Sequence, residues 1–461
     1  MDPSLPEAIV RLLAQRRQSL ADVVASAPLP AAFDALLIAS DFAATVLREV
    51  PDALALMQGP PLPPPTLDPA LPTQWPGLLR RWRKLGSLRP IWRDVAGLDD
   101  VDATLAGASA LADAAIETAL GAVEAQVAAA HGVIRDGDGQ PQRMVVFGLG
   151  KLGGGELNFS SDVDLIFAHE HGGSSDGARP LDADAYYARI GQRLIHLLDE
   201  VNADGFCYRV DMRLRPFGGV GRLALSFAAM EQYYQSEGRD WERYAWIKAR
   251  PVAGDFAAGE RLLATLRPFV YRRYLDYTAL DGLREMKAAI AADERRELAD
   301  HLKLGPGGIR EAEFFVQSLQ LVWGGQQHLL QTPSTIRALR VLRSLGLVGH
   351  REAMQFGADW ALLRRIEHRI HVWTGFQTHL LPKPGPDRER FARSLGFEAA
   401  APFERDLEAA KKRVADLFDS LIEEEASTTI DPTIEVLVDR LLTGAPREAI
   451  AEAVAAALPI D

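Results

Sequence analysis

The sequence predicts a mostly helical α+β protein, in which a small α/β unit lies between helical segments. Apolar runs that suit short strands occur at 144–148, 163–168 and 206–214. On either side of these runs, apolar residues recur three and four positions apart, which is the spacing of one helix face. A chain of 461 residues is too long for one typical core, so we expect two or three domains.

The first 132 residues are expected to form an N-terminal helical region. Helical spacing of apolar residues covers the segment up to about residue 58. The proline-rich stretch 59–77 suits neither a helix nor a central strand, because proline lacks an amide donor, and we expect a semi-rigid connector there. An alanine-rich helix should follow over 111–132 and end near Gly132.

Residues 133–270 are expected to form the domain that holds the strands, and residues 271–440 a helical bundle. An amphipathic helix is predicted over 183–201, between the second and third strands. After about residue 225 the pattern is helical almost to the end. Breaks rich in glycine and proline divide this region at 303–310, 323–327 and 381–387.

Composition narrows the class of protein. Hydrophobic content of 48% and charged content of 25% are typical of globular domains, and no apolar run approaches the roughly 18 residues that span a bilayer. Cys207 is the only cysteine, which excludes disulfides within the chain and thiolate zinc clusters and indicates a reducing cytoplasm. The net charge of −12 counts against a nucleic-acid partner, because phosphate neutralisation supplies most of the affinity for such partners.

The stretch 144–167 contains signatures of two different nucleotide sites. Gly148, Gly150 and Gly153 spell G-x-G-x-x-G after an apolar run, as in a dinucleotide-binding turn. That turn opens a helix of several turns before the next parallel strand. The next apolar run starts near Val163, too soon for a crossover of about a dozen residues or more. We therefore interpret the glycine match as fortuitous.

Asp162 and Asp164 favour a metal-dependent site instead. Residues i and i+2 of a strand point to the same face, so the two carboxylates should lie side by side. Neighbouring anions repel unless a cation lies between them, and carboxylate oxygens suit Mg²⁺ or Mn²⁺. The turn at Gly153, Gly154 and Gly155 would let backbone amides approach a phosphate. The alternative for the acidic pair is two solvated carboxylates at the start of a strand.

Asp211 is the predicted third acid. In the stretch 208–215, apolar residues alternate with Arg209, Asp211, Arg213 and Arg215 along a predicted strand. An aspartate centred among arginines, downstream of a D-x-D pair, is a candidate metal ligand. A structural salt bridge from Asp211 to Arg213 or Arg215 remains the alternative.

Four long stretches carry a resemblance that covers nearly the whole chain from about residue 80. They are GLGKLGGGELNFSSDVDLIFAHE, GFCYRVDMRLRPFG, GRDWERYAWIKAR and KLGPGGIREAEFFVQ. Together they closely resemble the bifunctional glutamine synthetase adenylyltransferase/adenylyl-removing enzymes. This resemblance implies that 133–270 form a DNA polymerase β-like nucleotidyltransferase domain with a small mixed sheet. Full-length members of the family carry two such halves in tandem.

The two halves of this family differ in sequence. G-G-G-E-L-N-F-S-S-D, R-V-D-M-R-L-R-P-F-G and G-R-D-W-E-R-Y are typical of the amino-terminal half, which removes adenylyl groups, and all three are present. The carboxy-terminal half, which adds them, tends to have E-V-D-x-R-L-R-P-S-G and W-x-W-E-H. No second copy of the S-S-D-x-D-L-I-F motif precedes Asp461, so we expect a piece of the parent enzyme in which 441–461 begin a linker to a missing second half.

The resemblance implies phosphorolysis as the reaction. Inorganic phosphate would attack the α-phosphorus of an AMP esterified to a tyrosine of glutamine synthetase, giving ADP and the unmodified synthetase. Asp162, Asp164 and Asp211 are the implied catalytic residues and the ligands of Mg²⁺ or Mn²⁺, expected as two ions. The implied partners are glutamine synthetase and the regulatory PII protein, without nucleic acid or membrane.

Further residues are expected to contact the phosphate or nucleotide. Ser160 and Ser161 either contact the nucleotide or cap the turn, with no preference between the two. The segment 303–310 has the form of a glycine loop entering a helix, which is an anion site, while Glu311 and Glu313 have no assigned role beyond complementing the helix dipole. The expected contacts are Lys151, Gly153, Gly154, Gly155, Ser160, Ser161, Arg213, Arg215, Lys303 and Arg310.

Three other functions are weighed against this one. Adenylyl transfer from ATP to the synthetase tyrosine uses the same metal ligands, and only the half-specific residues argue against it. The net charge of −12 argues against an RNA-directed nucleotidyltransferase. A non-catalytic module that senses nucleotide or a regulator is disfavoured because Asp162, Asp164 and Asp211 are all intact.

Overall fold

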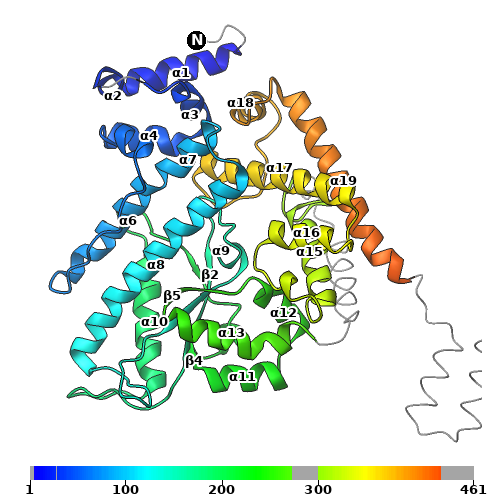
Figure 1. The fold of residues 1–461 in the computed structure, drawn as a ribbon. Helices are drawn as coiled ribbons and strands as arrows, with labels where there is room; N and C mark the ends of the chain where they lie inside the picture. Colours follow the sequence, from blue (N-terminus) through cyan, green and yellow to red (C-terminus); the bar gives the residue numbers. More distant parts are fainter. Residues whose placement is uncertain (1–4, 27–28, 273–299, 427–461) are drawn as a thin grey trace, which may run out of the picture.

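The computed structural model describes residues 5–26, 29–272 and 300–426, and Figure 1 shows N-terminal helices, a small sheet and C-terminal helices in chain order. The predicted fold class, a mostly helical α+β protein with a small mixed sheet, is confirmed. The expected linker at 441–461 lies outside the described residues, as do parts of the expected bundle.

The N-terminal region is helical, as predicted, but its second helical stretch is divided. Ser40 ends α3 (Phe33–Ala39) and caps α4 (Asp41–Glu49), because its Oγ accepts a 3.0 Å hydrogen bond from the amide of Ala43. The same hydroxyl donates to the carbonyl of Val372, which ties this break to the C-terminal helices. The other helices here are α1 (Glu7–Ser19), α2 (Ala21–Ser26) and α5 (Ala53–Gln58).

The proline-rich connector ends slightly earlier than predicted. A short 3₁₀ turn, η1 (Pro72–Gln74), leads into α6 (Trp75–Gly86), whose first turn accepts Pro76 because the amides there have no partner within the helix. After α7 (Leu88–Val95), the long helix α8 (Val101–His131) begins ten residues before the predicted start. It ends as predicted at Gly132, whose φ of 75° suits glycine.

The sheet is mixed. β1 (Val145–Gly148) pairs antiparallel with β2 (Val163–His169) and with β5 (Arg250–Gly254). On its other edge β2 pairs in parallel with β3 (Val210–Asp211) and β4 (Ala224–Ser226). Only the four-residue α9 (Gly150–Gly153) and a loop join β1 to β2, so the dinucleotide interpretation is excluded, as predicted.

Two strand predictions were wrong. The strand expected over 206–214 shrinks to Val210–Asp211, because the chain turns at once and Arg215 donates to the carbonyls of Met212 and Gly219. The helical pattern expected after residue 225 is interrupted by β5, whose Pro251 and closing Gly254 resemble a loop in the sequence.

Both faces of the sheet are buried. Along β2, Leu165 and Phe167 pack with α6, α8 and α10 (Ala183–Asp199), while Ile166 and Ala168 pack toward the opposite side. Figure 1 shows α8 and α10 on one side of the sheet and α11 and α13 on the other. The helices of this second side are α11 (Phe227–Ser236), α12 (Asp240–Ile247) and α13 (Phe256–Val270).

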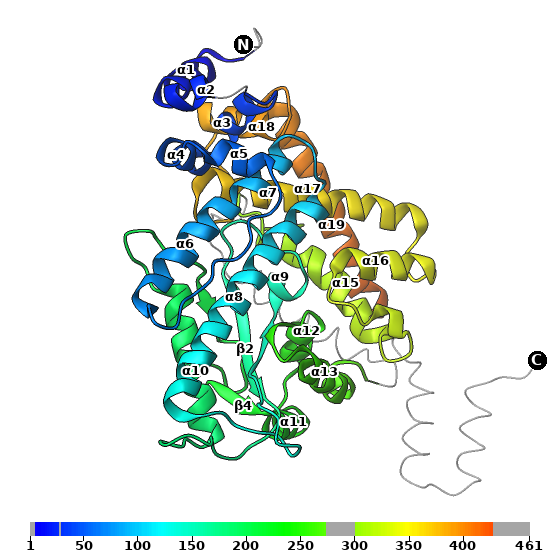
Figure 2. The same ribbon diagram turned by 60° about the vertical axis from the view of Figure 1, so that its left-hand side comes forward.

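The C-terminal helices share one hydrophobic core with this second face, without interruption at residue 270. The predicted breaks are confirmed, since helices start or end at each of them. Figure 2 shows α17 running between the N-terminal helices on one side and α15 and α16 on the other. The bundle consists of α15 (Ile309–Trp323), the 3₁₀ turn η3 (His328–Leu330), α16 (Thr335–Ser344), α17 (His350–Thr374), α18 (Pro386–Ser394) and α19 (Ala400–Ala426).

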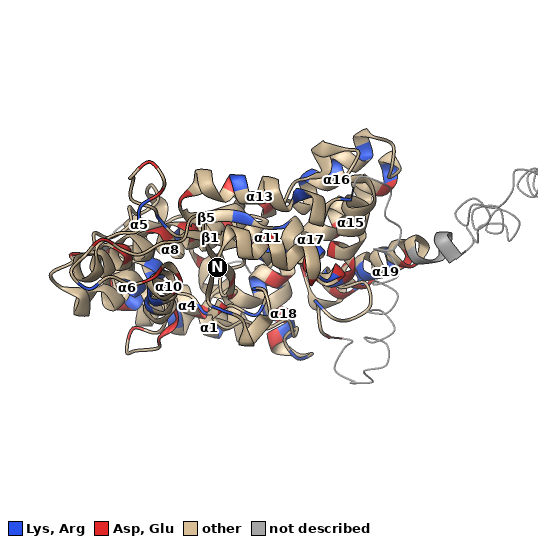
Figure 3. Ribbon diagram, turned by 90° about the horizontal axis from the view of Figure 1, so that it is seen from below, with Lys and Arg blue, Asp and Glu red and all other residues tan. Residues whose placement is uncertain are grey.

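Charged residues of both signs are interspersed along the elements in the view of Figure 3. None of the helices in the described parts of the chain is both long and apolar enough to cross a membrane.

Candidate active site

A pocket of about 210 Å³ opens where the start of β2 meets α9, α12 and the C-terminal helices. Asp162 and Asp164 line it together with Gly150 and Lys151 from the turn after β1. The remaining wall comes from the turn after β3, from α12 and the residue after it, from α15 and from two segments of the C-terminal region. This wall contributes Leu214, Tyr244, Ala245, Lys248, Lys303, Glu313, Phe314, Gln317 and Gln377.

The three predicted aspartates are brought together by the sheet. Asp164 and Asp211 are direct partners across the parallel pair β2–β3, and Asp162 lies two residues before Asp164. Burial raises the pKa of Asp164 to about 7, and repulsion from Asp162 and Asp211 adds to that rise. Clustered oxygen donors with excess negative charge fit a hard divalent cation such as Mg²⁺ or Mn²⁺.

Position 150 requires a glycine, because the carboxylate of Asp164 occupies the space that a side chain would need. The φ of Gly150 is +52°, and a Cβ atom there would lie 2.5 Å from Oδ2 of Asp164. The turn after β1 therefore lies directly against the acidic cluster. The glycine of this motif that faces the pocket is Gly150 rather than the following triplet.

Asp211 is engaged by Arg213 in the structure. The Arg213 guanidinium lies 2.5 to 3.0 Å from both carboxylate oxygens, and its backbone amide donates at 2.8 Å. The Arg213 side chain is 83% exposed, and its hydrogen bonds to Asp211 hold the pKa of that carboxyl below its usual range. The salt bridge weighed in the sequence is thus present, and it competes with metal binding for the same oxygens.

Lys151 and Lys303 both line the pocket, as expected for anion contacts. Burial lowers the pKa of Lys151 to about 8, against the opposing effect of Glu367. Its Nζ lies 2.5 Å from Oε1 of Glu367, which is fully buried in α17. A largely buried cation next to an acidic cluster is suited to receive a phosphate group.

The glycine triplet does not line the pocket. The amides of Gly153, Gly154 and Gly155 donate to carbonyls within their own turn. A Cβ atom at Gly153 would lie 1.9 Å from the carbonyl oxygen of Lys248, so this glycine permits close packing of α9 against the chain before β5. In the structure, the three glycines therefore shape the turn and its packing and do not face the pocket.

The two serines are buried beside the cluster. Ser160 donates from Oγ to the carbonyl of Gly375 at 3.1 Å. Ser161 Oγ has no hydrogen-bond partner among the described residues. Neither hydroxyl caps the turn.

The remaining predicted contacts have other neighbours. Arg215 donates to backbone carbonyls of the loop 212–221, and Arg310 does not line the pocket. Glu311 accepts from the amide of Gly307, where a Cβ atom would lie 1.7 Å from the carbonyl of α19 residue Lys411. This glycine loop thus packs against α19. Glu313 lines the pocket and lies 3.4 Å from Lys248.

Gln377 was missed by the sequence analysis. It follows α17 and donates from Nε2 to Oδ1 of Asp162 at 2.6 Å, while its Oε1 accepts from Arg209 at 3.2 Å. Lys248 was also missed, and it is held by Glu156 at 2.6 Å. No local pattern marks either residue, because their partners lie far away in the sequence.

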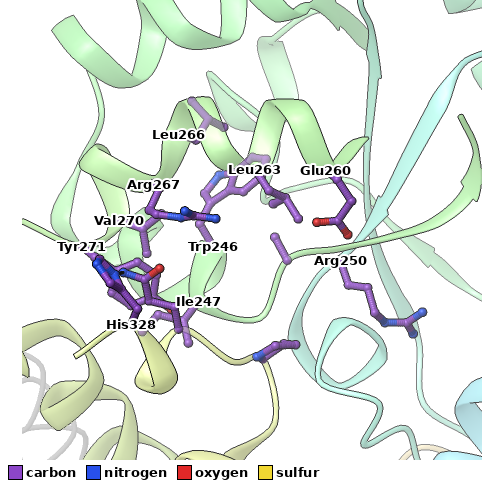
Figure 4. A pocket seen from close by; sticks show the side chains of 13 residues that line it. Trp246, Ile247, Arg250, Glu260, Leu263, Leu266, Arg267, Val270, Tyr271 and His328 are labelled. Carbon is purple, nitrogen blue, oxygen red and sulfur yellow. Dashed lines mark hydrogen bonds between the residues drawn. The ribbon is translucent and has the colours of Figure 1, made fainter. Parts of the chain in front are cut away.

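A larger pocket, of about 450 Å³, lies elsewhere, between α12, α13 and η3. Figure 4 shows Trp246, Leu263 and Leu266 along this pocket, with Arg250 and Glu260 at one end. None of the three aspartates lines it. We therefore place the candidate active site in the smaller pocket, where the acidic and basic side chains converge.

Comparison with known protein families gives two matches. Residues 70–265 match the family described as glutamate-ammonia ligase adenylyltransferase. Residues 284–422 match the family described as GlnD PII-uridylyltransferase. The first match contains all five strands, and the second covers much of the helical bundle.

Curated relatives extend the match to nearly the whole chain. The chain is 53% identical over 423 residues to the "bifunctional glutamine synthetase adenylyltransferase/adenylyl-removing enzyme" of Stenotrophomonas maltophilia (strain K279a), covering 91% of this chain and 45% of that protein. It is 52% identical over 440 residues to the protein of that name from Xanthomonas campestris pv. campestris (strain B100), covering 94% and 47%. The chain thus spans about half the length of the curated relatives it matches. Its similarity to the bifunctional glutamine synthetase adenylyltransferase/adenylyl-removing enzymes therefore extends over nearly the whole of this chain and about half of theirs.

Proposed function

We propose that this chain is the adenylyl-removing half of its family's enzyme, and that it removes AMP from a tyrosine of glutamine synthetase by phosphorolysis. The observation that carries the proposal is the pocket that Asp162 and Asp164 line together with Lys151 and Lys303. Asp211 does not itself line this pocket, but it pairs directly with Asp164 across β2–β3. Acidic residues for a metal and basic residues for an anion are the groups that phosphoryl-type transfer needs.

The direction of the reaction is inferred from the sequence. The stretches G-G-G-E-L-N-F-S-S-D, R-V-D-M-R-L-R-P-F-G and G-R-D-W-E-R-Y resemble the removing half, and all three border the pocket or its strands. Adenylyl transfer from ATP would use the same acidic residues. PII is the proposed regulator and glutamine synthetase the proposed protein substrate.

The metal ligands in this proposal are Asp162, Asp164 and Asp211. Mg²⁺ or Mn²⁺ held there, as one ion or two, would supply Lewis-acid stabilisation of the phosphoryl oxygens and of the departing tyrosinate. Asp211 must release Arg213 to join such a site, which frees this exposed arginine for an incoming anion. Gln377 fixes the rotamer of Asp162 through one oxygen and leaves the other free.

The basic residues bind and orient the nucleophile. Lys151 and Lys303 attract hydrogen phosphate, whose oxygen forms the new bond to the α-phosphorus as the phosphorus–tyrosine oxygen bond breaks. The proton of hydrogen phosphate ends on the tyrosine oxygen. The products are therefore ADP and glutamine synthetase with an unmodified tyrosine side chain. These side chains mainly hold hydrogen phosphate close to the phosphoryl group of AMP, against the repulsion between the two anions.

One assay tests the proposal. The chain is mixed with adenylylated glutamine synthetase, Mg²⁺ and phosphate, and the released nucleotide is identified by chromatography. Release of ADP is expected. AMP would indicate hydrolysis, and no release, even with PII present, would contradict the proposal and favour a module that only senses nucleotide or a regulator. Asp162→Asn should abolish the release without unfolding the chain.

A further inference from the structure

We propose that Glu367 of α17 is a positioning residue for Lys151, holding its ammonium group at the pocket wall and thereby setting how tightly the pocket binds inorganic phosphate. This inference rests on the proposed function for its role in turnover. Its structural basis is independent of the direction of the reaction.

The contact joins the wall of the pocket to the interior of the bundle. Lys151 lines the pocket, whereas Glu367 does not and is fully buried behind it. Nζ of Lys151 lies 2.5 Å from Oε1 of Glu367, and the lysine side chain is only 13% exposed. A lysine has four rotatable bonds, so a fixed partner at its tip decides where the charge lies.

Glu367 is itself held from several directions. Its Oε2 accepts from Nδ2 of Asn158 at 2.6 Å and from Arg364 at 2.5 Å. Nδ1 of His379 lies 2.9 Å from Oε1. These partners come from the loop before β2, from α17 and from the segment after α17. The carboxylate is therefore fixed by two parts of the chain that are far apart in sequence.

The same surroundings argue against a metal site at this position. Ligand atoms of Glu367, His371 and His379 lie within 4.8 Å of one another, which is close enough for a shared cation. Both oxygens of Glu367 are already occupied, however, and two of the groups around them are the cations Lys151 and Arg364. A divalent ion would add further positive charge to a buried site, which is costly.

Charge balance explains why a carboxylate is needed here. The charged and titratable groups that act on or respond to Lys151 include both signs. Without Glu367, Lys151 would face Arg364 and Lys303 with its nearest anion removed, and a buried unpaired ammonium is unstable. The groups are Glu367, Arg364 and His371 of α17, Asp164 of β2, Glu313 of α15 and Lys303. His379 acts on this set through its contact with Glu367.

A double-mutant cycle tests the inference. Glu367→Gln, Lys151→Met and the double variant are assayed for nucleotide release from adenylylated glutamine synthetase at varied phosphate. We expect Glu367→Gln to raise KM for phosphate by about tenfold or more with a smaller change in kcat, and to add nothing further in the Lys151→Met background. Additive effects would overturn the inference. Glu367→Asp keeps the charge, so it should give an intermediate KM and replaces Glu367→Gln if that variant does not fold.

A matched control separates positioning from general stability. Asp94→Asn breaks another buried ion pair of α17, because Asp94 lies 2.5 Å from Arg369, away from the pocket. It should lower the melting temperature without raising KM for phosphate. An equal rise in KM would show that any buried pair of α17 has this effect, and the inference would fail.

Phosphate binding without the synthetase distinguishes this inference from the proposed function. Isothermal titration of the full chain with inorganic phosphate and Mg²⁺ should show binding that Glu367→Gln weakens by about tenfold and Lys151→Met abolishes. Binding without nucleotide release would contradict only the proposed function. Unchanged binding in Glu367→Gln, or none in the unmodified chain, would overturn the role assigned to Glu367.

Discussion

Gln377 donates a 2.6 Å hydrogen bond from Nε2 to Oδ1 of Asp162, although the two residues lie 215 positions apart in the chain. One side belongs to the start of β2 and the other to the segment after α17. A side chain of the helical bundle therefore fixes an acidic residue of the sheet. The first prediction rests on this contact.

Gln377→Ala should weaken metal binding. Loss of the amide leaves Asp162 free to rotate, and removal of such a supporting hydrogen bond typically costs about 10- to 100-fold in metal affinity or activity. The measurement is nucleotide release as a function of Mg²⁺ concentration. Gln355→Ala is the control, because Gln355 is exposed on α17 and bonds only Asp359 at 3.3 Å among the described residues. An unchanged Mg²⁺ requirement in Gln377→Ala would contradict the prediction.

Asp164→Asn should stabilise the metal-free chain at alkaline pH. The folded-state pKa of about 7 exceeds the usual 3.8, so the folded state binds this proton more tightly and its stability falls as pH rises from about 4 to about 7. Asparagine does not ionise, so it avoids this loss of folding free energy, which is on the order of a few kcal/mol. Melting temperatures at pH 4 and pH 8 measure it, with a gain expected at pH 8. Added Mg²⁺ should stabilise the unmodified chain and have little effect on the variant.

Arg213→Ala should lower the Mg²⁺ concentration needed for activity. Removal of the guanidinium leaves only the backbone amide of residue 213 bound to Asp211, at Oδ1, so the pKa of this carboxyl should rise toward its usual value. Stability should change by less than about 1 kcal/mol, because the arginine of this pair is exposed to solvent. The control is Arg222→Ala, which breaks the exposed pair of Arg222 with Asp184, a residue that does not line the pocket. A higher Mg²⁺ requirement in Arg213→Ala would show that the salt bridge supports Asp211 rather than blocking it.

Gly150→Ala should abolish activity, whereas Gly155→Ala should not. Both glycines have positive φ, so each substitution should cost about 1 to 2 kcal/mol of backbone strain. Only at Gly150 would the new Cβ atom meet a carboxylate, at 2.5 Å from Oδ2 of Asp164, while nothing lies within 4 Å at Gly155. Nucleotide release and melting temperature, measured on both variants, separate the two effects. Equal activities would contradict the assigned position of Asp164.

The sequence predicted the local parts of the site better than the distant ones. The pairing of Asp162 and Asp164 follows from strand geometry, and the adjacency of Asp211 follows from its alternation with arginines. Lys248, Glu367 and Gln377 escaped notice, because their partners are set by the packing of the bundle on the sheet. Hydrophobic periodicity reports which face is buried and carries no information about what covers it.

The strand errors have the same origin. The alternation of 208–215 suited a strand throughout, yet pairing with β2 stops at Asp211. Beyond it, Arg213 binds the carboxylate of Asp211 and Arg215 binds carbonyls of the turning backbone. β5 was missed because Pro251 weakens the strand pattern, although an edge strand tolerates proline. In both cases tertiary pairing decided the extent of the strand.

The pocket is built from the sheet and from the C-terminal segments, and this has a consequence during synthesis on the ribosome. A nascent chain that has just completed β3 already contains the three aspartates, but Lys303, Glu367 and Gln377 have not yet been translated. An acidic cluster without its basic and amide partners is an incomplete site. We therefore expect truncated translation products that stop before α17 to release no nucleotide, so that activity reports a chain whose bundle has docked.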